Sequence, residues 1–136
     1  MAVDFSVEYP AIQKIADQRG LDPLFIAAIR LAENGADGKQ YGVLTAAAPD
    51  YDSQLRVCTR TIAGYLQEYD GNPFVLIEGA AGLKRLVYSA AFIQYVRNHY
   101  APIGADNDPN SLNTNWLVNV MSFYTKFTQF GYPVLT

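Results

Sequence analysis

Apolar residues recur at helical spacing along most of this chain, and glycine, proline and asparagine separate the repeats. Residues 9–18 carry apolar side chains three and four apart, and Pro10 suits the first turn of a helix there. The next helix is expected to start at Asp22, a favourable N-cap, followed by Pro23 as first helical residue. Its body, LFIAAIRLA, is apolar on nearly every side and ends before Gly35. This pattern predicts a central, buried helix.

Further helical patterns fill the rest of the chain. Residues 50–69 place apolar side chains three and four apart and predict a second long helix. A shorter helix is expected to open at Asn72-Pro73, followed by glycine interruptions and a helix over about residues 83–98. The last helix is expected over about residues 113–129. The prediction is an all-α fold.

Two polar loops interrupt the helices, at residues 35–50 and 100–112. The first contains the apolar piece YGVL, so a small hairpin or short irregular β segment is possible near residues 40–45. The length of 136 residues suits one domain with one core, and no repeat or linker divides it. We therefore expect a single domain, residues 1–136, of five to six helices.

Composition and charge narrow the possible functions. Half of the residues are hydrophobic and 17% are charged, which is typical of a globular protein. The net charge of -3 provides no basic footprint for nucleic acid. The single cysteine, Cys58, excludes an internal disulfide framework and is expected to be a small buried hydrophobe. One histidine, His99, and scattered carboxylates give no metal-ligand spacing, so no cofactor is expected.

The chain shows no targeting or membrane-spanning pattern. Its N-terminal residues lack a cationic segment followed by an apolar one, so no secretory signal is expected. No uncharged apolar run of about 18 residues is present, so no membrane span is expected. We expect synthesis in the cytoplasm without a signal peptide.

Glu33 is the main candidate for chemistry. It closes the apolar central helix and lies on the same stripe as Ile26 and Ile29. Desolvation by apolar neighbours and the negative end of the helix dipole both favour the neutral acid. Such a carboxyl can donate a proton near neutral pH. The alternative is a surface ion pair with Arg30.

The glycine-spaced loop after Glu33 and the tyrosines are candidates for ligand contact. Gly35, Gly38 and Gly42 allow the backbone to approach a ligand closely. Ten tyrosines are present, and aromatic faces with polar edges suit carbohydrate. The alternatives are an ordinary connecting loop and tyrosines that belong mainly to the core.

The segment IADQRGLDPLFIAAIRLAENG resembles the opening of the goose-type lysozyme and soluble lytic transglycosylase group and the related glucosaminidase domains. In these lysozyme-like proteins a helix after a Gly-hydrophobic-Asp-Pro turn ends in the catalytic glutamate, usually within Glu-Ser-Gly. Here the motif is Glu33-Asn34-Gly35, and YGVL occupies the place of a Gly-Leu-Met-Gln segment. The resemblance covers roughly residues 10–125 and is nearest to small phage and prophage domains.

The resemblance implies cleavage of the MurNAc-GlcNAc β-1,4 bond of peptidoglycan, with Glu33 as general acid. It implies a glycan strand, and other phage particle proteins, as partners, and the bacterial cell wall as the place of action. The substrate-binding residues expected on this basis are Tyr41, Gly42, Val43, Tyr51, Gln54, Tyr100 and Asn107.

The sequence also departs from the family pattern. Asn34 replaces the usual serine, and Thr45 stands where the transglycosylases have glutamine. No second catalytic carboxylate has a motif, and the candidates are Asp37, Asp50, Asp52 and Asp106. The absence of a clear second acid favours a lytic transglycosylase over a hydrolase. Two alternatives remain open: a non-catalytic wall-binding or phage structural protein of this fold, and an all-α interaction module.

Overall fold

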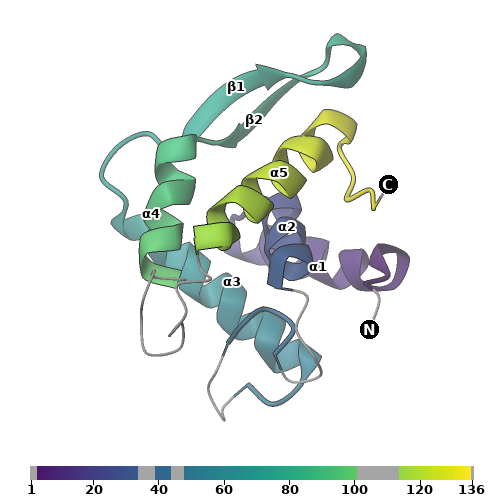
Figure 1. Ribbon diagram of the computed structural model, residues 1–136, viewed down its shortest axis with the longest axis vertical. Helices are drawn as coiled ribbons and strands as arrows, with labels where there is room; N and C mark the ends of the chain where they lie inside the picture. The colour runs from purple at the N-terminus through teal and green to yellow at the C-terminus, as the bar shows by residue number, and fades with distance from the viewer. Residues whose placement is uncertain (1–2, 34–38, 44–47, 101–113, 136) are drawn as a thin grey trace.

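The described residues form five α-helices and one antiparallel hairpin (Figure 1). The computed structural model describes residues 3–33, 39–43, 48–100 and 114–135. The elements, in chain order, are α1 (Phe5–Arg19), α2 (Pro23–Glu33), α3 (Tyr51–Glu68), β1 (Phe74–Glu78), a 3-10 turn (Ala80–Gly82), β2 (Lys84–Tyr88), α4 (Ala90–Tyr100) and α5 (Thr114–Phe130). The expectation of a mostly helical fold is confirmed.

The central helix is α2, as the sequence predicts. Residues 24–30 are all buried, and α5 packs along α2 while α1 packs on another side (Figure 1). The ring of Phe25 makes edge-on contacts with Tyr88 and Tyr124, with ring centroids 5.1 and 5.3 Å apart. Aromatic contacts of this kind add to the burial of apolar area, so α2 is anchored on the side of the hairpin and α5.

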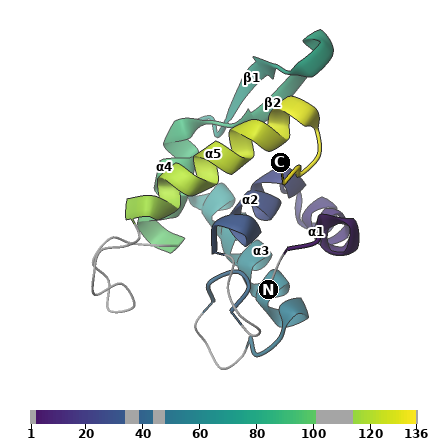
Figure 2. The ribbon, with the colours of Figure 1, turned by 45° about the vertical axis from the view of Figure 1, so that its right-hand side comes forward.

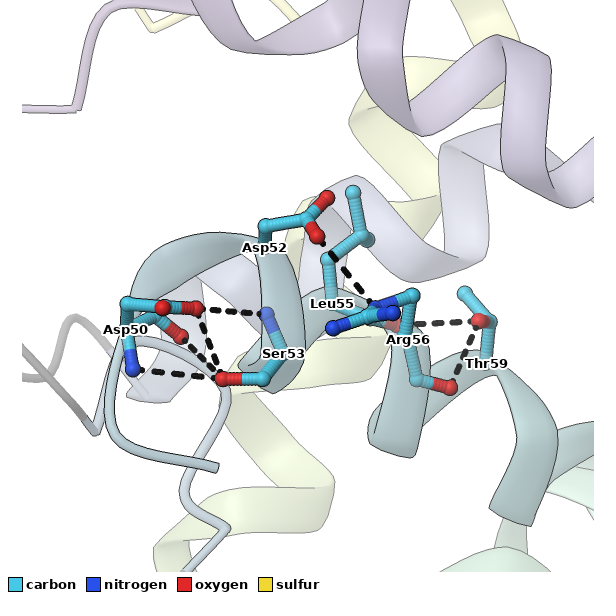
Figure 3. Close-up of polar contacts among 6 residues, drawn as sticks. All are labelled: Asp50, Asp52, Ser53, Leu55, Arg56 and Thr59. Carbon is cyan, nitrogen blue, oxygen red and sulfur yellow. Dashed lines mark hydrogen bonds and ion pairs between the residues drawn. The ribbon is translucent and has the colours of Figure 1, made fainter. Parts of the chain in front are cut away.

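The helix starts follow side-chain capping. Asp22 accepts a hydrogen bond from the Leu24 amide at 3.0 Å, as expected of the N-cap of α2. In α3, Asp50 and Ser53 form a capping box, in which each side chain bonds the other residue's amide (Figure 3).

The start of α1 differs from the prediction. The helix begins at Phe5 rather than Tyr9, because Asp4 caps it through the Ser6 amide. Pro10 therefore lies inside the helix and not in its first turn.

Residues 72–88 correct the sequence-based prediction. The short helix expected from Asn72-Pro73 is instead β1, which pairs with β2 in the register Phe74↔Tyr88 to Glu78↔Lys84. The helix expected from residue 83 begins only at Ala90. The apolar runs FVLIE and KRLVY fit strands, and the glycines between them belong to a hairpin turn.

No strand is present in residues 39–43, which form a turn, so the β segment expected near residues 40–45 is not seen in the described part of that range. The hairpin extends past the helices at one end of the molecule (Figures 1 and 2). Within the described residues, none of the helices combines the length and apolar character needed to cross a membrane.

Candidate functional site

Glu33 is the last residue of α2, and its carboxyl meets the first turn of α5. The indole Nε1 of Trp116 donates a hydrogen bond of 2.9 Å to Oε2 of Glu33. Trp116 is buried, whereas the Glu33 side chain is half-buried. Within the described residues, the fold therefore fixes one carboxylate oxygen through a neutral donor.

Burial shifts the ionisation of this carboxyl. It raises the pKa of Glu33 from 4.5 to about 7, and the Trp116 hydrogen bond acts in the opposite direction. An N–H donor favours the charged form, but here the loss of hydration is the larger effect. Near neutral pH the carboxyl is therefore present in both protonation states, as a general acid requires.

Arg30 does not pair with Glu33. Its guanidinium instead binds Glu8 of α1 through Nε–Oε1 at 2.8 Å and Nη2–Oε2 at 3.3 Å. Both side chains are largely buried, and the guanidinium also lies 5.8 Å from the ring centroid of Tyr51. The alternative of an Arg30–Glu33 surface pair is therefore wrong, and Glu33 keeps a raised pKa because that cation is engaged elsewhere.

The backbone of Gly42 lies against the Glu33 carboxyl. A Cβ atom built on Gly42 would lie 2.6 Å from Cδ and 2.6 Å from Oε2 of Glu33. Gly42 also has φ +75°, which side chains rarely adopt. Its amide closes a turn by bonding the Lys39 carbonyl at 3.0 Å. Only glycine satisfies both the turn and the close approach to Glu33.

Gln54 of α3 holds this turn in place. Its Oε1 accepts from the Tyr41 and Val43 amides at 3.1 and 3.2 Å. Its Nε2 donates to the Val43 and Ala48 carbonyls at 2.8 and 2.9 Å. The side chain is fully buried, so Gln54 positions the loop and is not exposed for substrate contact, contrary to the role expected from the sequence.

Tyr41 also has a supporting position. It is fully buried, and its hydroxyl lies 2.8 Å from that of Tyr51. The Tyr100 hydroxyl donates to the Tyr41 carbonyl, and the Tyr100 ring lies 5.9 Å from that of Trp116 between centroids. Tyr41 therefore cannot line a groove in this conformation.

The remaining expected residues divide into three groups. Gly42, Val43, Tyr51 and Tyr100 are partly accessible; Gly42 lies against Glu33, whereas Tyr51 contacts Tyr41 and Arg30. Asn107, Asp37 and Asp106 lie outside the described residues. Asp50 caps α3, and Asp52 is an exposed partner of Arg56 at 3.3 Å, so both have local roles (Figure 3).

Two residues of this region were not assigned from the sequence. Trp116 donates a hydrogen bond to Glu33. Glu8 forms an ion pair with Arg30, so Arg30 does not pair with Glu33. The only signal for the first was the position of the chain's single tryptophan near the start of the last predicted helix. No local pattern identifies Glu8, because the ion pair joins two helices.

A second half-buried carboxyl, Asp22, has a different environment. Burial raises its pKa, while hydrogen bonds from Tyr124 and the Leu24 amide lower it. The Tyr124 hydroxyl donates at 2.6 Å, and the Asp22 amide donates to the Tyr88 hydroxyl at 3.0 Å. Both carboxylate oxygens are thus occupied, which indicates a structural joint between α2, β2 and α5.

In the described part of the chain, no three His, Cys, Asp or Glu side chains are grouped to hold a metal ion. His99 bonds the Tyr95 carbonyl through Nδ1 at 2.8 Å and packs against the rings of Tyr65 and Tyr95. Comparisons with protein families, curated proteins and solved structures found no match for this chain.

Proposed function

We propose that this protein has a lysozyme-like fold and cleaves the β-1,4 bond between MurNAc and GlcNAc in peptidoglycan, with Glu33 as general acid. The observation that carries the proposal is the environment of Glu33: a half-buried carboxyl at a helix end, with a pKa raised by burial to about 7. The central helix opened by Asp22-Pro23 and ended by Glu33 supports the fold that the sequence motif implies.

The contacts of Glu33 assign different tasks to its two oxygens. Oε2 accepts the Trp116 hydrogen bond, which leaves Oε1 to carry the proton. When Oε1 gives this proton to the glycosidic oxygen, the bond from that oxygen to the MurNAc C1 breaks and Glu33 becomes a carboxylate. The Trp116 N–H then stabilises the new charge, because a hydrogen bond to an ionised acceptor is stronger than one to a neutral acceptor.

The second step follows one of two routes. In a lytic transglycosylase, the carboxylate of Glu33 takes the proton of the MurNAc C6 hydroxyl while that oxygen bonds to C1, giving a 1,6-anhydro product. In an inverting hydrolase, a second carboxylate about 6.5–9.5 Å away activates water. Asp50 and Asp52 have other partners, Asp37 and Asp106 lie outside the described residues, and none of the four has a catalytic motif, so we favour the transglycosylase route.

A non-catalytic wall-binding or particle protein of this fold is the second candidate. The net charge of -3 supports it, because an anionic wall attracts basic enzymes more strongly. The proposed acid would then be a residue retained only for the fold.

Digestion of purified peptidoglycan, with mass spectrometry of the released fragments, separates these possibilities. The wild type is compared with Glu33→Gln and with Glu68→Gln, a control that replaces the glutamate ending α3. We expect 1,6-anhydro muropeptides from wild type and control and none from Glu33→Gln. Reducing-end muropeptides lost in Glu33→Gln would indicate a hydrolase. No release by the wild type across pH and wall types would favour the non-catalytic candidate.

A further inference from the structure

Three arginines from two helices line a hollow that shares no residue with the Glu33 site. Arg19 ends α1, and Arg56 and Arg60 lie one turn apart on α3. Together with Ser53 and Val57 they line an open hollow with a volume of about 360 Å³. The chain has 10 Lys and Arg and 13 Asp and Glu, so its net charge is negative. This hollow, by contrast, gathers three guanidinium groups.

The positive charge in this hollow is only partly neutralised. Arg56 pairs with Asp52 at 3.3 Å, and these side chains are 59% and 78% exposed, so water weakens the pair (Figure 3). For Arg19 and Arg60, the described residues provide no ion-pair partner. The Arg19 Nε is buried and has no acceptor among the described residues. A buried donor without a partner is unfavourable, so the hollow holds positive charge that the described protein groups do not compensate.

A second hollow adjoins the first. It has a volume of about 400 Å³, shares Arg56, and adds Lys14 and Gln18 of α1, the carboxylate of Asp52 and three apolar side chains. One further basic side chain, Lys14, therefore lies between α1 and α3 beyond the three arginines, in a hollow that also contains Asp52. This continuity gives room for a ligand that extends past a single anionic group.

We propose that the hollow lined by Arg19, Arg56 and Arg60 binds a phosphate group. Guanidinium forks match the oxygens of phosphate and carry a fixed charge. Three of them suit a group of charge about −2 better than a carboxylate of charge −1. The protein's acidic balance and the small size of the patch disfavour a nucleic-acid backbone. The phosphate belongs either to a free phosphate or phosphate ester, or to a phosphate-containing polymer.

Titration with inorganic phosphate at constant ionic strength, followed by amide chemical shifts, tests the proposal. We expect saturable shifts at residues 53–60 in the wild type. Binding should weaken at least tenfold in Arg60→Gln and further in Arg56→Gln/Arg60→Gln. Arg97→Gln removes an arginine of α4 outside the hollow and should leave binding unchanged.

A substitution that is expected to tighten phosphate binding strengthens the test. Asp52→Asn removes the carboxylate that competes for Arg56, and it should tighten phosphate binding several-fold. The Glu33→Gln variant should bind phosphate like the wild type, which separates this site from the proposed catalytic function. Absence of saturable shifts, or equal weakening in Arg60→Gln and Arg97→Gln, would overturn the proposal.

A glycerol phosphate oligomer distinguishes the two sources of phosphate. The oligomer is compared with inorganic phosphate in the wild type and in Lys14→Gln. An oligomer that binds more tightly than inorganic phosphate, and loses affinity in Lys14→Gln, would support a polymer that spans both hollows. Equal affinity for the oligomer and for inorganic phosphate would support recognition of a single phosphate group.

Discussion

The α-carbon of Gly42 faces the carboxyl group of Glu33, and any side chain at position 42 would occupy the space of that carboxyl. A Cβ there would lie 2.6 Å from Cδ of Glu33 and 2.8 Å from Oε1. The turn that contains Gly42 thus covers one side of the carboxyl, while Trp116 binds it through Oε2. These two contacts help to define where the acid of the proposed reaction is held.

Gly42→Ala is expected to disturb Glu33 more than a glycine substitution elsewhere does. Both a left-handed φ and a clash oppose alanine at this position, so we expect a loss of at least about 2 kcal/mol in the free energy of unfolding. Gly20→Ala is the matched control, because Gly20 has φ +70° but open space around its Cβ position. Its expected loss is about 1 kcal/mol. Denaturant unfolding measures both, and equal losses would contradict the close approach to Glu33.

The raised pKa of Glu33 predicts a pH-dependent difference in stability between the wild type and Glu33→Gln. The pKa of Glu33 is about 7 in the folded protein and 4.5 in the unfolded chain. The folded state therefore binds more protons than the unfolded chain between these pH values. The contribution of Glu33 is therefore fully present below pH 4.5 and is lost as pH rises through 7. A pKa difference of about 2.5 corresponds to about 3 kcal/mol. Glu33→Gln should gain this amount relative to the wild type between pH 4 and pH 8.

Urea unfolding of both proteins across this pH range measures the effect. A stability difference that stays constant from pH 4 to pH 8 would contradict a desolvated Glu33. A difference that changes only below pH 4.5 would indicate a carboxyl stabilised in its charged form.

The sequence predicted α2 well because the residues that start this helix and bury it all lie within one short stretch of the chain. Asp22, Pro23 and the apolar body of α2 act through local capping and through burial on nearly all sides. The hairpin was mistaken for helix because its apolar runs are only five residues long, and such short runs fit either structure. Only pairing across the turn distinguishes the two.

The contacts around Glu33 were less accessible to sequence reasoning. Glu33 itself stood out because it ends an apolar helix, but its partner Trp116 is 83 residues away. Gln54 and Tyr41 looked like surface contacts because polar and tyrosine side chains usually reach water. Both are buried here because Gln54 satisfies backbone groups of the turn and Tyr41 binds other tyrosines. These roles depend on long-range packing that no local pattern records.

Trp116→Phe is expected to raise the pKa of Glu33 above 7. Phenylalanine keeps an aromatic ring beside Tyr100 but removes the Trp116 hydrogen bond, which lowers this pKa. Loss of a hydrogen bond to a charged group, worth about 1.5–3 kcal/mol, corresponds to about one to two pKa units. Titration of the Glu33 carboxyl carbon by NMR measures it. Tyr95→Phe is the control, since its hydroxyl donates to Glu68 of α3 at 3.1 Å, and an unchanged pKa in Trp116→Phe would contradict the assigned contact.

Glu8→Gln is expected to destabilise the protein by about 3–5 kcal/mol, because it leaves the buried Arg30 guanidinium without its carboxylate. Arg30 Nη1 already lacks an acceptor within the described residues, so few groups remain to compensate the charge. Asp52→Asn breaks the exposed pair with Arg56 and should change stability by less than about 1 kcal/mol. Chemical denaturation of both variants compares a buried pair with an exposed one. Similar small losses in both would mean that Arg30 finds another acceptor, and in that case a fall in the Glu33 pKa would identify Glu33 as that acceptor.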